Sequence, residues 1–122
     1  MLECLVKANE IQGCIGFEND FKEMGVDHPL LTQVASTAVL TRMLGGTLDQ
    51  VINAVSNAWI DSSLAVVRHA PNTGWRKSWA AADASLQAVR LALMAVKGEM
   101  GYPSVLTAKQ YGFYDARFGG KP

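Results

Sequence analysis

Residues 78–97 read SWAAADASLQAVRLALMAVK, and this stretch decides the fold that we expect. Its apolar residues recur at three- and four-residue intervals, the period of an α-helix that buries one face. Alanine is dense here, and small side chains allow the backbone of a neighbouring helix to approach closely. We therefore predict a helix from about Ser78, its N-cap, to Lys97, near the centre of a helical bundle.

Three further segments have helical periodicity, and the period-two alternation typical of β-strands is absent. The first covers about residues 2–17. The second begins at Pro29, whose fixed φ suits a first helical turn, and ends at Gly45 and Gly46. Thr47 and Gln50 form a capping-box pattern that begins the third. After Gly98 the chain is rich in Gly, Pro and aromatic residues, which predicts loop with one or two short helical turns. The expected fold class is all-α, a helical bundle.

Size and charge limit the classes of protein that fit. The chain has 122 residues, 49% of them hydrophobic, which is enough for one core but not for two. We expect a single domain over residues 1–122. Eleven basic residues balance eleven acidic ones, so no broad positive field is available for a nucleic-acid backbone. The longest good apolar run, LALMAV at 91–96, is too short to span a bilayer.

The cysteines and histidines are few and scattered. Cys4 and Cys14 are ten residues apart on one predicted helix, about 15 Å along its axis, so they cannot form a disulfide with each other. With His28 and His69 they form no metal-ligand spacing. We expect structural thiols in an intracellular protein and no bound metal.

His28 is the first residue whose position suggests chemistry. In the sequence GVDHP at 25–29 it falls at the start of the second predicted helix. The positive end of a helix dipole favours the neutral imidazole, the form that accepts a proton, so His28 suits a general base. The alternative is that its side chain merely closes the loop through a hydrogen bond.

A second candidate site is RHAPNTGWRKSW at 68–79, where three cations and a histidine occur without an acid. Arg76 and Lys77 stand at the start of a helix, where their charges oppose the dipole unless an anion binds between them. Arginine matches carboxylates and phosphates, and lysine can also donate a proton. In the alternative interpretation these cations are solvated and pair with Asp61 and Asp83. Trp75 and Trp79 favour partial burial of the loop.

Six stretches together resemble the MmgE/PrpD family, and within it the 2-methylcitrate dehydratases of propionate catabolism (the methylcitrate cycle). They cover nearly the whole chain: LVKANEIQGCIGFENDF, GVDHPLLTQVASTAVLTRMLGG, AVSNAWID, VRHAPNTGWRKSWAAADA, AVRLALMAVKGEMGYPSVLTA and YGFYDARF. The family also includes cis-aconitate decarboxylase and iminodisuccinate epimerase. The resemblance implies a cofactor-independent lyase, and this chain matches the later part of the family's helical domain.

The resemblance also implies roles for individual residues. His28 and Lys77 match the family's catalytic histidine and lysine. The candidates for binding substrate carboxylates are Arg68, His69, Asn72 and Arg76. In DSSLAVVR at 61–68 this chain departs from the Gly-Gln-Ser-Leu-Arg-Thr-Tyr type of stretch of close relatives, and so lacks an expected arginine.

Family members are considerably longer, so we expect a fragment or truncated gene product, inactive alone, that lacks upstream helices and a C-terminal α+β domain. The alternative is a non-catalytic helical remnant or interaction module that needs a partner chain. Missing helices would leave apolar faces exposed, so we expect association as a dimer or with a complementary chain. The expected ligand is a small tricarboxylate, with neither nucleic acid nor membrane as partner. The cytoplasm is the expected compartment in a bacterium, and the mitochondrial matrix in a eukaryote.

Overall fold

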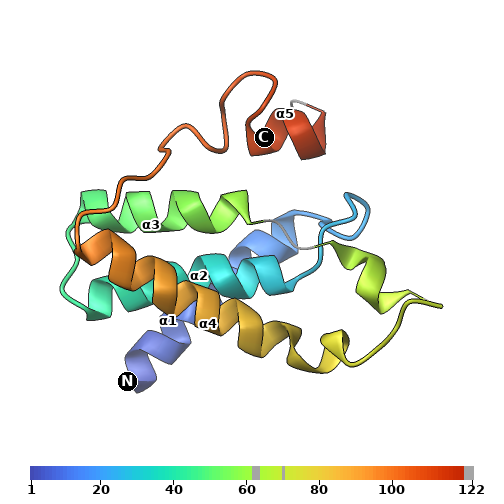
Figure 1. Ribbon diagram of the computed structural model, residues 1–122, viewed down its shortest axis with the longest axis horizontal. Helices are drawn as coiled ribbons and strands as arrows, with labels where there is room; N and C mark the ends of the chain where they lie inside the picture. The colour runs from blue at the N-terminus through green and yellow to red at the C-terminus, as the bar shows by residue number, and fades with distance from the viewer. Residues whose placement is uncertain (62–63, 70, 120–122) are drawn as a thin grey trace.

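The computed structural model describes residues 1–61, 64–69 and 71–119, which form a helical bundle (Figure 1). The helices are α1 (Leu2–Glu18), α2 (Pro29–Met43), α3 (Leu48–Ile60), the 3-10 helix η1 (Ala65–Arg68), α4 (Arg76–Val96) and α5 (Phe113–Phe118). Within these ranges the extended structure is a single isolated bridge between Val26 and Leu64. The predicted all-α class is confirmed.

Helix α2 lies at the centre of the bundle and contacts α1, α3 and α4. Figure 1 shows α2 and α4 running in the same direction and α3 running in the opposite direction. The amino termini of α2 and α4 therefore lie at one end of the bundle, together with η1. This arrangement places the positive ends of two helix dipoles near each other.

Small residues allow α2 and α4 to pack closely. The buried residues of α4, apart from Leu91, are alanines, namely Ala80, Ala84, Ala88, Ala92 and Ala95. On α2 the fully buried Thr37 and Thr41 donate their hydroxyl hydrogens to the carbonyl oxygens of Gln33 and Thr37, both at 2.7 Å. The close approach expected from the alanines is confirmed, although α2 rather than α4 is the central helix.

The helix starts agree with the sequence at α3 and differ at α4. Thr47 Oγ1 accepts the Gln50 N–H at 3.3 Å, and Gln50 Oε1 accepts the Thr47 N–H at 2.9 Å, so the capping box is confirmed. Helix α4 begins at Arg76 with Trp75 as N-cap, so the prediction that Ser78 caps it is wrong. The Lys77 and Ser78 N–H groups instead donate to the carbonyls of Gly74 and Trp75, which starts the helix two residues earlier.

The segment after α4 returns over α3 and ends in α5, which is the short helical turn predicted from the sequence. Its backbone passes so close to α3 that a Cβ at Gly101 would lie 2.4 Å from the Asn53 Cα. Ser56 Oγ accepts the Tyr102 N–H at 2.8 Å in the same contact. Phe113 of α5 then packs on Trp59, with ring centroids 4.9 Å apart.

Helix α1 is the least buried part of the bundle. It has no buried residue, and Phe17 is 93% exposed. Cys4 and Cys14 are both free, as predicted; Cys4 is half-buried and Cys14 is exposed. Among the described helices, none combines the length and the apolar character needed to cross a membrane.

Candidate functional site

The candidate residues lie at the end of the bundle where α2 and α4 begin (Figure 1). His28 is the N-cap of α2, and Arg76 and Lys77 are the first two residues of α4. Arg68 ends η1. His69 and Asn72 belong to the turn between η1 and α4, where the Asn72 N–H donates to the His69 carbonyl at 2.8 Å. Of the same stretch, Ala70 lies outside the described residues, as do Ser62 and Ser63 of the DSSLAVVR departure.

A buried carboxylate joins two of these segments. Asp27 is only 3% exposed, accepts the His28 N–H at 2.9 Å and forms an ion pair with Arg68 Nε. The same Oδ1 lies 3.4 Å from His28 Nδ1. Asp27 was not among the residues predicted from the sequence. The signal that could have revealed it is its place just before a helix that begins with proline, where carboxylates are favoured.

The His28 side chain remains accessible. It is 57% exposed and makes no capping hydrogen bond, so the interpretation that it merely closes a loop gains no support. Its backbone is helical, with φ −62° and ψ −20°. With Asp20 and Lys22 the residue lines a pocket of about 250 Å³. A neutral imidazole in this position can accept a proton from a bound molecule.

The two cations that begin α4 have different surroundings. The Arg76 guanidinium lies 4.6 Å from the ring centroid of Trp79, and its Nη2 is 3.7 Å from Asp83 Oδ2. This ion pair agrees with the alternative interpretation, although Asp61 pairs with Arg90 instead. Lys77 is exposed, and its ammonium group has no hydrogen bond or ion pair within the described part of the chain.

The tryptophans do not bury this turn as predicted. Trp75 is 87% exposed and Trp79 is 45% exposed. The first turn of α4 contains no acidic residue and no side-chain cap. Two cations therefore remain at the positive end of this helix, where the dipole disfavours them. A bound anion would neutralise the cations and accept the uncapped N–H groups of the first turn.

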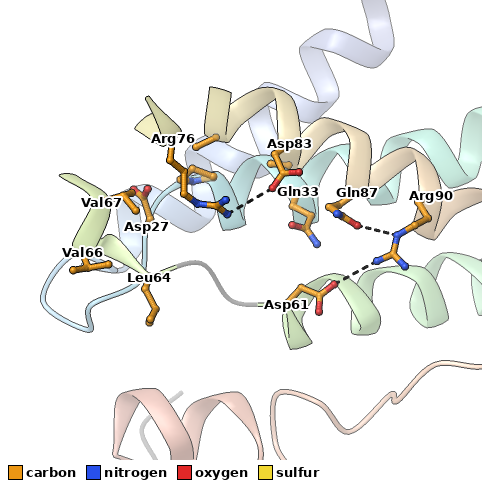
Figure 2. Close-up of a pocket in the computed structure, with 13 residues that line it drawn as sticks. Asp27, Gln33, Asp61, Leu64, Val66, Val67, Arg76, Asp83, Gln87 and Arg90 are labelled. Carbon is orange, nitrogen blue, oxygen red and sulfur yellow. Dashed lines mark hydrogen bonds and ion pairs between the residues drawn. The ribbon is translucent and has the colours of Figure 1, made fainter. Parts of the chain in front are cut away.

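A pocket of about 650 Å³ opens between these elements (Figure 2). Of the residues predicted from the sequence, Arg76 lines it, whereas His28 faces the smaller pocket beside it. Its polar lining comes from α2 and α4, from the residue that follows α3 and from the second residue before α2: Asp27, Gln33, Asp61, Arg76, Asp83, Gln87 and Arg90. Over the residues with described positions, no three His, Cys, Asp or Glu side chains form a group that could hold a metal ion.

Comparison with known proteins gives consistent results. The chain matches the MmgE/PrpD N-terminal domain over residues 1–122. It is 63% identical over 122 residues to a 2-methylcitrate dehydratase of Salmonella typhimurium, covering 99% of this chain and 25% of the relative. It is 61% identical over 123 residues to that of Cupriavidus necator, covering 100% and 25%. A Yarrowia lipolytica relative named 2-methylcitrate dehydratase, mitochondrial, is 55% identical over 122 residues, covering 99% and 24%.

These relatives are much longer than this chain, which spans about a quarter of their length. The match nevertheless covers the chain from its first residue to its last and includes both stretches that form the candidate site. The chain therefore belongs to the MmgE/PrpD family.

Proposed function

We propose that this chain supplies a general base and carboxylate-binding side chains to a hydro-lyase that dehydrates 2-methylcitrate to 2-methylaconitate. The observation that carries the proposal is that α2 and α4 begin at the same end of the bundle (Figure 1), the end that also holds His28, Arg68, Arg76 and Lys77. The names of the three relatives agree with this chemistry.

The first step needs a base. Dehydration removes a proton from a carbon beside a carboxylate and expels hydroxide from the neighbouring carbon. His28 has an accessible imidazole whose Nδ1 side faces Asp27, so its Nε2 is the atom that accepts the proton. The Asp27 carboxylate stabilises the imidazolium that forms.

The remaining groups bind the substrate carboxylates and protonate the hydroxide that leaves. Arg68 uses Nε for Asp27, which leaves its terminal nitrogens for a substrate carboxylate, and Arg76 adds a second guanidinium. His69 and Asn72 contribute donors from the exposed turn. Lys77 donates a proton to the departing hydroxide, so that water leaves as the carbon–carbon double bond forms.

A chimera tests this function directly. We expect activity when residues 1–122 replace the matched quarter of the Salmonella typhimurium relative, because the longer protein supplies the remainder of the fold. The measurement is the ultraviolet absorbance of the conjugated double bond produced from 2-methylcitrate. The unaltered relative is the positive control. A chimera that folds, as judged by circular dichroism, but leaves 2-methylcitrate unchanged would contradict the proposal.

A second candidate function is that of a helical module that binds a partner chain. The observation that favours it is the apolar surface of α1, where Leu2, Leu5, Val6 and Phe17 are each at least half exposed. Clusters of exposed apolar side chains commonly mark interaction sites.

This second candidate function predicts that copies of the chain associate with one another. The hydro-lyase function is also compatible with such association. In sedimentation velocity we expect the 122-residue chain to form dimers or larger species, because association removes the α1 side chains from water. Replacing Leu5 and Phe17 with serine should restore the monomer. The association proposal fails if the unaltered chain sediments as a monomer over the same concentration range.

A further inference from the structure

Gln33 on α2 is a buried side chain without a polar partner. It is 4% exposed, and its Nε2 has no hydrogen bond to any residue of the described chain. Thr37 and Thr41, the next buried polar residues of the helix, are both satisfied by carbonyls of their own helix. A buried donor without an acceptor loses the hydrogen bonds that it makes to water in the unfolded chain. Gln33 therefore weakens the fold, and packing gives no reason for an amide there.

The amide borders the 650 Å³ pocket. Figure 2 shows the Gln33 side chain directed into the space between Asp61 and the α4 residues Asp83, Gln87 and Arg90. It lies one helical turn beyond Pro29, which lines the same pocket near Arg76. The Gln33 side chain therefore borders a cavity that extends to the candidate site.

Two guanidinium groups line the same pocket as the Gln33 amide. Arg76 and Arg90 are 14 residues apart on α4, about 21 Å along the axis. Arg76 reaches forward to Asp83, however, and Arg90 reaches back, so that its Nε donates to Gln87 Oε1 at 2.8 Å. Figure 2 shows the two guanidinium groups on opposite sides of the Gln33 amide, one beside Asp83 and the other beside Gln87.

The arginine terminal nitrogens are not hydrogen-bonded in these contacts. Arg76 Nη2 lies 3.7 Å from Asp83, and Arg90 Nη2 lies 3.8 Å from Asp61, both longer than a hydrogen bond. Half-exposed ion pairs of this length contribute little to stability, so a better acceptor can replace them. The pocket therefore presents N–H donors from three side chains, and the Asp61 and Asp83 carboxylates that also line it lie beyond hydrogen-bonding distance of the two arginines.

Oxygen acceptors with negative charge fit these donors best, because hydrogen bonds from guanidinium and amide groups to carboxylates are strong. We infer that this pocket is a carboxylate subsite, in which the Gln33 amide donates to one carboxylate of a small di- or tricarboxylic acid flanked by Arg76 and Arg90. The inference rests on the proposed function for the class of ligand and extends it to Gln33 and Arg90.

The test uses the 122-residue chain and tricarballylate, a tricarboxylate without a hydroxyl group that cannot be dehydrated. Binding is followed by the shifts of side-chain amide signals in 1H–15N NMR spectra. We expect Gln33→Leu to weaken binding about tenfold or more, since it removes a hydrogen bond to a charged group. The same change should raise the Tm by about 3 °C, because leucine buries no unpaired donor.

Two further variants complete the design. Gln12→Leu changes the same residue type on α1, outside this pocket, and should leave tricarballylate affinity unchanged. Arg90→Gln changes a half-exposed residue with a weak ion pair, so we expect it to weaken binding about tenfold without lowering the Tm. If Gln33→Leu does not fold, Arg90→Gln still tests the subsite.

Several outcomes would overturn the inference. They are no titration by the unaltered chain, equal binding by Gln33→Leu, or a lower Tm in that variant with unchanged affinity, which would mean that the amide has a structural partner. Equal affinity for inorganic phosphate would also overturn it as a carboxylate subsite. An active chimera beside a chain that does not bind would leave the proposed function standing, and binding beside an inactive chimera would leave the subsite standing.

Discussion

Lys77→Ala in the chimera with the Salmonella typhimurium relative is expected to lower the rate of 2-methylcitrate dehydration about a hundred- to ten-thousand-fold, the range lost with a general acid or base. The reason is that Lys77 has an exposed ammonium group with no partner in the described structure, at the positive end of α4. Its proton is therefore available to the departing hydroxide. The measurement is kcat from the ultraviolet absorbance of the product.

The matched control is Lys97→Ala at the opposite end of α4, which should leave kcat unchanged. Lys77→Arg keeps the charge but transfers a proton poorly, so we expect its KM to stay near that of the parent while kcat falls. Turnover retained in Lys77→Ala would rule out the catalytic role.

Asp27→Ala should produce the largest loss of stability among the site variants, about 3 kcal/mol. The change leaves Arg68, which is 24% exposed, without its ion-pair partner, and it removes the acceptor of the His28 N–H. Because Arg68 keeps some contact with water, the loss should fall at the lower end of the range for a broken buried pair. Urea denaturation followed by circular dichroism measures the free energy of unfolding.

Asp49→Ala is the control for Asp27, since it also removes a carboxylate near a helix start but from an exposed position. We expect it to cost less than about 1 kcal/mol. A double-mutant cycle with Arg68→Ala should show coupling between Asp27 and Arg68. Equal losses in the two aspartate variants would show that the buried ion pair does not hold η1 against α2.

Much of the local structure was predictable because its causes lie within a few residues. The capping box depends on Thr47 and Gln50, three positions apart, and Pro29 begins α2 through its own ring. The alanines of α4 predicted a close contact with another helix, because small side chains allow its backbone to approach. The start of α4 was predicted two residues late, because backbone hydrogen bonds of the turn replaced the expected Ser78 cap.

Some residues of the candidate site were likewise predictable from the sequence, and others were not. His28, Arg76 and Lys77 were found from their places at helix starts, and Arg68 from the acid-free run of cations that precedes one of them, whereas Asp27 and Gln33 were not found. Their significance depends on partners far away in the sequence, since Asp27 contacts Arg68 at a separation of 41 residues. The lack of a partner for Gln33 is likewise visible only when the packed helices close around it.

The sequence by itself determined the helical class, most helix ends, the two cationic and histidine-bearing helix starts and the resemblance to the MmgE/PrpD family, since each follows from neighbouring residues. Only the tertiary structure decided that α2 is central, that Asp27 binds Arg68 and that the buried Gln33 amide borders a pocket without a hydrogen-bond partner in the described chain. Burial and long-range pairing arise when helices pack, and side chains 40 or more positions apart then share one environment.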